Sequence, residues 1–219
     1  MKNFFSHFDE PFNGFSHLIG ALISIVLLFI LMEASKSDPL NYKFAFVIYG
    51  ITLIGMFASS SVYHLLKVSE STKTKLKRID HIMIFLLIAG SYTPIATVGL
   101  DVSSSYTILI IVWVIAAIGI IKKLYWLYAP VWISTGVYLV MGWISVFIFP
   151  QLWEVMPNAF MLWIAIGGLF YSIGAIIYAA KYPNPIPGKF GHHEIWHLFV
   201  MGGAFSHFWA IYKFLPNTM

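Results

Sequence analysis

The sequence predicts an all-α membrane protein, a bundle of seven transmembrane helices. Hydrophobic residues make up 59% of its 219 residues, and charged residues make up only 10%. Soluble domains contain about 45–50% apolar and about 25% charged residues. A chain this apolar has too little polar surface to stay in water, so lipid must be its solvent. Apolar segments long enough to cross a bilayer also recur along the whole chain.

A helix that crosses a bilayer needs about 20 mostly apolar residues. The segments that meet this requirement are, in order, Ser16–Ala34, Tyr42–Leu66, Ile79–Gly99, Tyr106–Ile121, Tyr128–Phe149, Ala159–Ala180 and Glu194–Leu215. The fourth is the shortest, and Pro130 is expected to kink the start of the fifth. No linker or repeat divides the chain. We therefore expect residues 1–219 to form one seven-span domain, with residues 1–15 as a cytoplasmic N-terminal segment and no cleaved signal peptide.

The distribution of basic residues predicts the orientation of the spans. With the N-terminus inside, the inside segments carry 10 Lys and Arg residues and the outside segments carry 3. The inside residues are Lys2, Lys67, Lys73, Lys75, Lys77, Arg78, Lys122, Lys123, Lys181 and Lys189, and the outside residues are Lys36, Lys43 and Lys213. Cytoplasmic loops are enriched in Lys and Arg. We therefore expect a multi-pass protein of the cell membrane with a cytoplasmic N-terminus and an outside C-terminus.

Four ionisable side chains fall at one depth near the cytoplasmic face. His64 ends the second span, Asp80 opens the third, and His193 and His197 open the seventh. Ionisable groups within spans are costly, usually face the bundle interior and indicate a functional site. Simpler interpretations exist for each alone, because a histidine at a span end can be a harmless interfacial residue and Asp80 can cap its helix. The convergence of four such groups favours a site.

The residue types predict a zinc site. The chain has no cysteine, so only His, Asp and Glu can bind a metal. His193 and His197 lie one turn apart on one helix face, and His64 would complete a three-histidine site with a fourth position for water. Zinc lowers the pKa of such a water to about 7. Asp80 would be its hydrogen-bond acceptor or general base, and Ser60, one turn before His64, could orient the site.

The same segment offers a second interpretation. Residues 193–197 read H-E-x-x-H, the pattern of zinc metalloproteases, in which Glu194 would be the catalytic base.

The remaining histidines are weaker candidates. His17 opens the first span and could approach the site, whereas His207 is too far along its helix and is expected to be a polar packing contact. His81 and His192 are expected to point elsewhere on their helices, and His7 to lie in the soluble tail.

Motifs along the chain resemble those of the hemolysin III family, the bacterial branch of the progestin and adipoQ receptor superfamily, which is related to alkaline ceramidases. They are Glu10-Pro-Phe-Asn13-Gly-Phe-Ser-His17-Leu-Ile-Gly20, Ser60-Ser-Val-Tyr-His64, Arg78-Ile-Asp80, His193-Glu-Ile-Trp-His197 and Phe205-Ser-His207-Phe. Together with the length, they resemble Bacillus-type members.

The resemblance implies seven helices, a zinc ion bound by His64, His193 and His197, and a zinc-bound water held by Asp80. The related receptors lack a Glu after the first histidine of the last span, so this site does not require Glu194. Their soluble N-terminal domain is absent here, and hormone binding is therefore not carried over.

These observations lead to a hydrolase hypothesis with two alternatives. We expect zinc-dependent hydrolysis of a lipid amide or ester, as in a ceramidase-like enzyme, with membrane lipid as substrate or ligand. The family name suggests a haemolytic, pore-forming toxin instead, and a regulator of membrane lipid state with structural zinc is a third hypothesis. No nucleic-acid partner is expected, and a homo-oligomer stays open.

Overall fold

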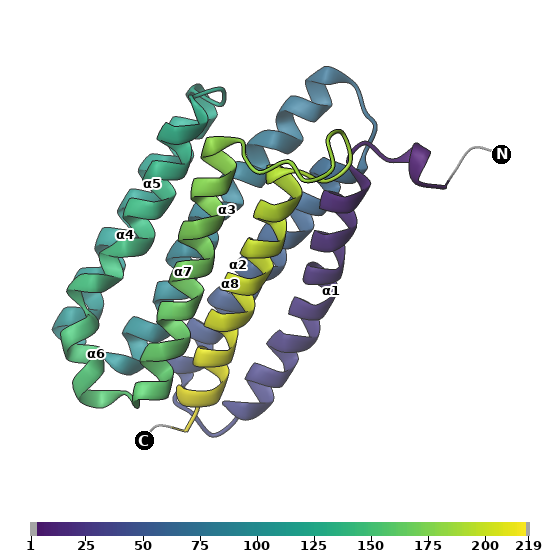
Figure 1. The fold of residues 1–219 in the computed structure, drawn as a ribbon. Coiled ribbons are helices and arrows are strands. Elements are labelled where there is room, and N and C mark those ends of the chain that lie inside the picture. The colour runs from purple at the N-terminus through teal and green to yellow at the C-terminus, as the bar shows by residue number, and fades with distance from the viewer. Residues whose placement is uncertain (1–3, 218–219) are drawn as a thin grey trace.

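The computed structural model describes residues 4–217, and most of this part of the chain is helical (Figure 1). Its helices are η1 (Phe4–His7), α1 (Pro11–Ala34), α2 (Leu40–Leu65), α3 (Glu70–Gly99), α4 (Val102–Tyr125), α5 (Val131–Trp143), η2 (Ile144–Phe147), α6 (Phe149–Val155), α7 (Asn158–Ala180) and α8 (His192–Phe214). Over residues 4–217 no β-strand forms, and one isolated bridge joins Ile186 and Phe190. The predicted all-α class is confirmed.

The long helices lie side by side in one bundle (Figure 1). Each of the first four packs against the next along the chain, α7 packs against α5 and α8, and α8 also contacts α1. Helices α2 and α3 are the most enclosed, since 56% of the apolar stretch of each is buried, compared with 22% for α4. Side chains that face the interior from these two helices are therefore shielded from the surroundings of the bundle.

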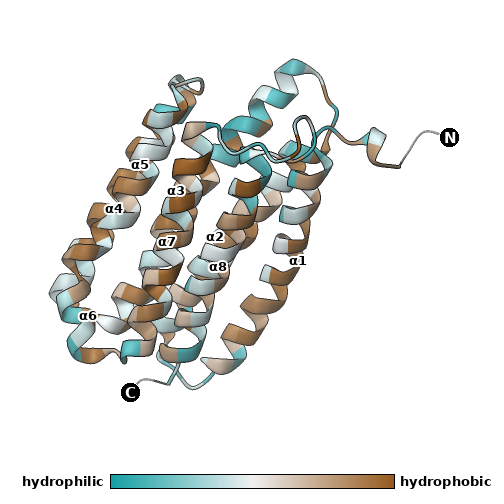
Figure 2. Ribbon diagram, in the orientation of Figure 1, coloured by the Kyte–Doolittle hydropathy of each residue, from teal (hydrophilic) through white to brown (hydrophobic). Residues whose placement is uncertain are grey.

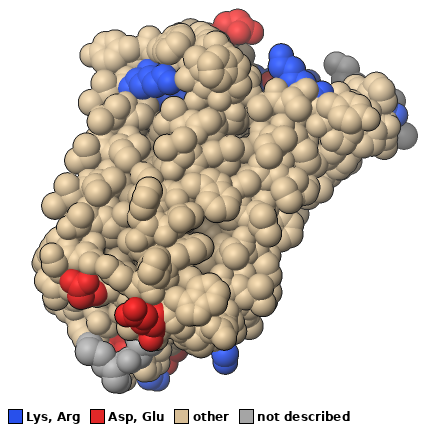
Figure 3. All heavy atoms as spheres, turned by 60° about the vertical axis from the view of Figure 1, so that its left-hand side comes forward, with Lys and Arg blue, Asp and Glu red and all other residues tan. Residues whose placement is uncertain are grey.

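The surface of the bundle is that of a membrane protein. Large apolar side chains such as Phe29, Ile110 and Ile176 are exposed on its outer faces, and hydrophobic residues dominate the middle of the helices (Figure 2). On the face shown in Figure 3, charged side chains lie only towards the two ends. Five helices are long and apolar enough to cross a membrane, and a sixth span results if the bent pair α5–α6 counts as one. The protein is a multi-pass membrane protein.

The segment predicted as the seventh span is a helix, α8, but it does not qualify as a span by length and composition. Four histidines in its sequence lower its mean hydropathy. It nevertheless lies lengthwise beside α7 and contacts α1 (Figure 1).

The fifth predicted span, Tyr128–Phe149, differs most from the structure. Pro130 does not kink a helix but lies at the N-cap of α5. The helical path bends by 50° where α6 begins, and Pro150 lies in the first turn of α6. Proline has no N–H to donate and clashes with the preceding turn, which explains why a new helix starts here in a new direction.

Two helices are longer than predicted because polar residues cap their starts. The fourth helix begins before Tyr106, since the Asp101 carboxylate accepts hydrogen bonds from the N–H groups of Ser103 and Ser104 at 2.9 and 3.1 Å. The third begins at Glu70, where the Ser69 hydroxyl accepts from the Thr72 N–H. The first helix also begins earlier than predicted, so residues 11–15 of the predicted N-terminal segment belong to α1.

Candidate metal centre

Three histidines from two helices meet at the end of the bundle where α8 begins. His64 lies in the last turn of α2, and His193 and His197 lie one turn apart at the start of α8. One ring nitrogen from each of the three lies within 4.8 Å of the others. His64 and His197 are each 2% exposed, so these imidazoles are removed from bulk water. The sequence-predicted triad is therefore brought together.

This arrangement could hold a metal ion. Two nitrogens bound to one zinc ion at about 2.1 Å each lie at most about 4.2 Å apart, so the triad is close to the spacing that one ion requires. The Nδ1 atom of His197 is buried and has no hydrogen-bond partner among the described residues. A buried polar atom without a partner is costly, and a donor set of three imidazoles suits a zinc-like divalent ion. The residues fit the ion that the sequence predicts.

The carboxylate of Glu10 joins two of the three histidines, a feature that the sequence analysis did not identify. Its Oε2 accepts a hydrogen bond from Nδ1 of His64 at 2.9 Å and lies 3.4 Å from Nδ1 of His193. Because the carboxylate can only accept, His64 carries its proton on Nδ1 and keeps the Nε2 lone pair free for a ligand bond. Burial would raise the pKa of Glu10, but the hydrogen bonds from His193 and His64 outweigh it and hold this pKa well below its usual range.

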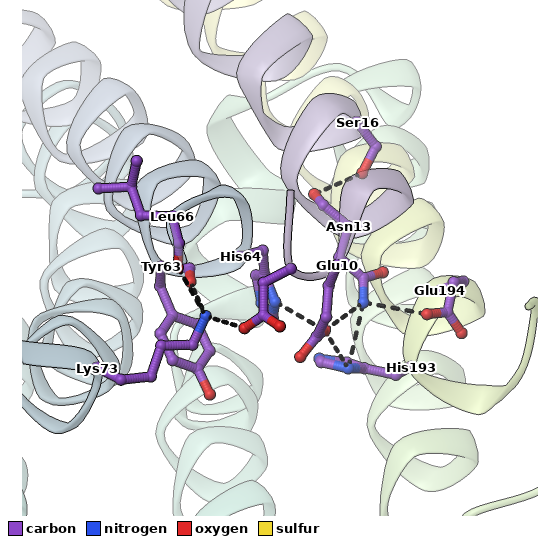
Figure 4. A network of polar contacts seen from close by, with 10 residues as sticks. Glu10, Asn13, Ser16, Tyr63, His64, Leu66, Lys73, His193 and Glu194 are labelled. Carbon is purple, nitrogen blue, oxygen red and sulfur yellow. Dashed lines mark hydrogen bonds and ion pairs between the residues drawn. The ribbon is translucent and has the colours of Figure 1, made fainter. Parts of the chain in front are cut away.

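Asn13, one turn after Glu10 on α1, connects the same groups (Figure 4). Its side-chain Nδ2 donates to Glu10 at 2.8 Å and to Glu194 at 3.1 Å. Asn13 is fully buried between α1 and α8. Together, Glu10 and Asn13 fix the start of α1 against the start of α8, where two of the three histidines lie.

The chain before α1 is fixed against the end of α2. The N–H groups of Asp9 and Glu10 donate to the carbonyl oxygens of Leu65 and His64 at 3.3 and 2.9 Å. Lys73 from α3 forms an ion pair with Asp9 at 2.5 Å and donates to the Tyr63 carbonyl at 2.6 Å (Figure 4). These bonds satisfy carbonyl groups that a helix C-terminus otherwise leaves unpaired, and they set the position of the Glu10 carboxylate.

Asp80 and Ser60 lie beside the histidines. Asp80 is only 9% exposed, and it lies close enough to His64 and His193 to interact with them electrostatically. Ser60 is a hydrogen-bond partner of the Asp80 carboxyl. In this structure the ring of His64 is thus oriented by Glu10, whereas the hydroxyl of Ser60 interacts with Asp80.

Glu194 caps the start of α8. Its Oε2 accepts a hydrogen bond from the N–H of Gly191 at 2.8 Å, which caps the start of α8, and its Oε1 accepts from Asn13. Glu194 is not among the residues that line the cavity described below. Both carboxylate oxygens of Glu194 therefore accept hydrogen bonds from the protein itself.

The other histidines differ in their relation to the centre. His17 lies against it, with its ring 3.9 Å from that of His197 and both ring nitrogens buried without a hydrogen-bond partner in the described part of the chain. His207 makes a polar packing contact, 3.3 Å from the Ile164 carbonyl. His192 contacts Asn184 in the loop before α8, and His7 the carbonyl of Phe4. His81 lines the cavity.

The triad and Asp80 face a cavity of about 1070 Å³. Its wall is formed mainly by apolar side chains of α3, α5, α7 and α8, and it continues from the histidines along the bundle as far as His207 and Leu152. Small-molecule sites are typically about 300–1,000 Å³ and mostly apolar with a few polar groups. This cavity has that character, with the histidine triad and Asp80 at one end.

Comparison with known proteins identifies the family of this chain. The family model described as "Haemolysin-III related" matches residues 5–208. The chain belongs to the hemolysin III family. It is 35% identical over 204 residues to the Hemolysin-3 homolog of Bacillus subtilis (strain 168), covering 93% of this chain and 92% of that protein. It is also 35% identical to Hemolysin-3 of Bacillus cereus over 215 residues, 96% of this chain and 94% of that one.

A more distant relative of this hemolysin III family protein is an adiponectin receptor protein of Drosophila melanogaster. The identity is 28% over 229 residues, which covers 96% of this chain and 51% of the receptor. The resemblance inferred from the motifs is confirmed.

Replacing Glu10 with glutamine should weaken divalent-ion binding by about 10–100-fold, because carboxylates that orient a metal-binding imidazole typically contribute this much to affinity. The measurement is a competitive titration of the purified protein with zinc and a chelator. Glu33→Gln is the matched control, since Glu33 pairs with Lys36 on the exposed surface at the other end of α1. Equal affinity in Glu10→Gln and wild type would contradict the role assigned to Glu10.

Proposed function

We propose that this protein is a zinc-dependent hydrolase of a lipid amide or ester, with the ion held by His64, His193 and His197. The observation that carries the proposal is the position of the buried histidine triad and Asp80 at one end of a large apolar cavity. Hydrolytic metal sites combine three protein ligands with an open position for water or substrate. An acyl chain suits the rest of the cavity, because its wall is mostly apolar.

Zinc is favoured over other ions by the chemistry of the donors. The three donors are imidazole nitrogens, and the chain has no cysteine. Calcium and magnesium prefer oxygen ligands, whereas imidazole suits zinc. A zinc ion bound here would polarise a carbonyl group and lower the pKa of a water molecule to about 7.

Asp80 acts as the general base in this proposal. Its carboxylate accepts the proton of the attacking water, whose oxygen bonds to the carbonyl carbon of the lipid. The carbon–nitrogen bond of an amide, or the carbon–oxygen bond of an ester, then breaks, and the proton passes from Asp80 to the leaving amine or alcohol. Ser60 orients the Asp80 carboxyl, and Glu10 orients His64.

The topology that goes with this function has seven spans, a cytoplasmic N-terminus, residues 1–15 as the N-terminal segment and an outside C-terminus. Residues 1–219 then form a single domain. The position of α8 between α7 and α1 supports its assignment as the seventh span (Figure 1). The excess of Lys and Arg in the segments assigned to the inside supports the orientation. The metal centre would then lie near the cytoplasmic face.

Reporter fusions to the full chain test this topology. Alkaline phosphatase after residue 219 should be active, and a fluorescent protein at the same position should stay dark, because the C-terminus is outside. The same two reporters placed before residue 1 should give the opposite pattern. A fluorescent C-terminal fusion with inactive phosphatase would mean six spans and would contradict the assignment of α8.

The alternatives predict different behaviour. A regulator with structural zinc should lose stability on His64→Ala and be indifferent to Asp80→Asn. A pore-former should lyse red cells with a defined osmotic-protection cutoff and should not need Asp80. A metalloprotease would need Glu194 as its base, and the two hydrogen bonds that occupy this carboxylate weigh against that role.

Asp80→Asn should lower the turnover of a hydrolysed lipid amide or ester by at least about 100-fold, since a general base typically contributes about 10²–10⁴. The assay is release of fatty acid from a panel of lipid amides and esters by the purified protein in lipid nanodiscs, with bound metal quantified in the same samples. Asp101→Asn is the control, because Asp101 caps α4 away from the cavity. Full turnover by Asp80→Asn, or no zinc-dependent turnover of any lipid by the wild type, would refute the hydrolase proposal.

A further inference from the structure

Lys123 is a charged side chain in an unusual place. It lies in the last turn of α4, is only 2% exposed, and donates from Nζ to the hydroxyl of Ser134 on α5 at 2.9 Å. Its neighbour Lys122 is partly exposed and lies over the ring of Trp126, 5.1 Å from the ring centroid. The two adjacent lysines therefore lie in different environments.

The membrane setting explains Lys122 but not Lys123. Lysines at the end of a span normally extend along the apolar surface and keep their ammonium group in water. Lysine is almost never fully buried unless it is paired, and the only hydrogen-bond partner that the structure gives Lys123 within residues 4–217 is a neutral hydroxyl. A buried ammonium group with so little compensation would be stabilised by an anion beside it.

The surroundings of Lys123 are basic and face the cavity. Lys77 and His81, one turn apart on α3, lie close enough to Lys123 to interact with it electrostatically. These three side chains and Ser134 all line the cavity. The Nδ1 atom of His81 is buried without a hydrogen-bond partner among the described residues. Donor groups from three helices thus converge on one part of the cavity wall.

One carboxylate lies near this cluster and does not neutralise it. Asp80 is near enough to Lys77 and Lys123 to interact with them, but it also interacts with His64, His193 and Ser60, on the side of the metal-binding candidates. Lys77 itself lies over the ring of Tyr128, 5.2 Å from the centroid, at the edge of the cavity. Two ammonium groups therefore face one shared carboxylate, which leaves an excess of positive charge.

We propose that Lys123, Lys77 and Ser134 form a subsite for the phosphate group of an anionic lipid whose acyl chain occupies the apolar part of the cavity. A phosphate offers several charged oxygens, and it can accept hydrogen bonds from donors on different helices at once. Lysine binds phosphate as a compact point charge. The subsite deepens the proposed function, since it names the class of lipid, and it rests on that proposal only in treating the cavity as a lipid site.

Equilibrium binding of two matched single-chain lipids tests the subsite. The probes are palmitoyl lysophosphatidic acid, whose phosphate is terminal and anionic, and palmitoyl lysophosphatidylcholine, whose choline neutralises it. The readout is the fluorescence of cavity-lining tryptophans such as Trp132, Trp143 and Trp196. The wild type should bind the anionic lipid about tenfold more tightly or better, because one hydrogen bond to a charged group changes a dissociation constant by about that factor. Lys123→Met should abolish the preference.

Three further variants serve as controls. Lys122→Met removes an equal charge from the next position and should retain the preference, whereas Lys123→Arg keeps the charge and should retain most of it. Binding is measured in parallel in His197→Ala, in which hydrolysis is abolished, so that failure of the enzyme proposal and failure of the subsite are separable. Equal affinity of the wild type for both lipids, or an unchanged preference in Lys123→Met, would overturn the proposal. Displacement of the lipid by inorganic phosphate at a comparable affinity would overturn its assignment to a lipid.

Discussion

The Glu10 carboxylate links the three parts of the chain on which the candidate metal centre depends. It precedes α1, accepts a hydrogen bond from His64 at the end of α2, and lies beside His193 at the start of α8. The ring of His64 is buried, and its hydrogen bond to the partly exposed Glu10 carboxylate keeps Nδ1 from being left unpaired, which would be costly. The interaction therefore both closes one end of the bundle and orients an imidazole for ligand binding. Without it, three histidines on two helices would have more freedom to move apart.

The histidines were predictable from sequence, and their supporting residues were not. Counting spans gives the depth of each polar residue, so His64 and the pair on α8 could be placed at one end of the bundle without a structure. Glu10 and Asn13 lie just outside or at the start of the first span, where polar residues are common, and their depth alone carries no signal. The spacing that could have identified them is the run of Glu10, directly before α1, and Asn13 and His17 within α1, because intervals of three and four residues place side chains on one side of a helix.

The helix boundaries predicted from hydropathy were wrong where a local polar side chain or a proline determines where a helix starts. Asp101 and Ser69 start helices earlier than apolar content suggests, since a side-chain cap satisfies N–H groups that would otherwise be unpaired. Pro150 starts α6 in a new direction within a continuous apolar segment. The last helix shows the opposite effect, because the histidines that build the centre also lower the hydropathy by which a span is recognised. In α8 the histidines of the candidate metal centre therefore work against its recognition as a span.

Metal binding by the histidine triad is tested most directly by the metal content of the purified protein, prepared without chelators and measured by mass spectrometry. We expect about one zinc ion per chain, lost in His64→Ala and His197→Ala but retained in Asp80→Asn. His207→Ala should also retain it, since this buried histidine of α8 contacts the Ile164 carbonyl instead of the triad. A wild-type protein without bound metal, or with metal that survives both triad substitutions, would contradict the central claim.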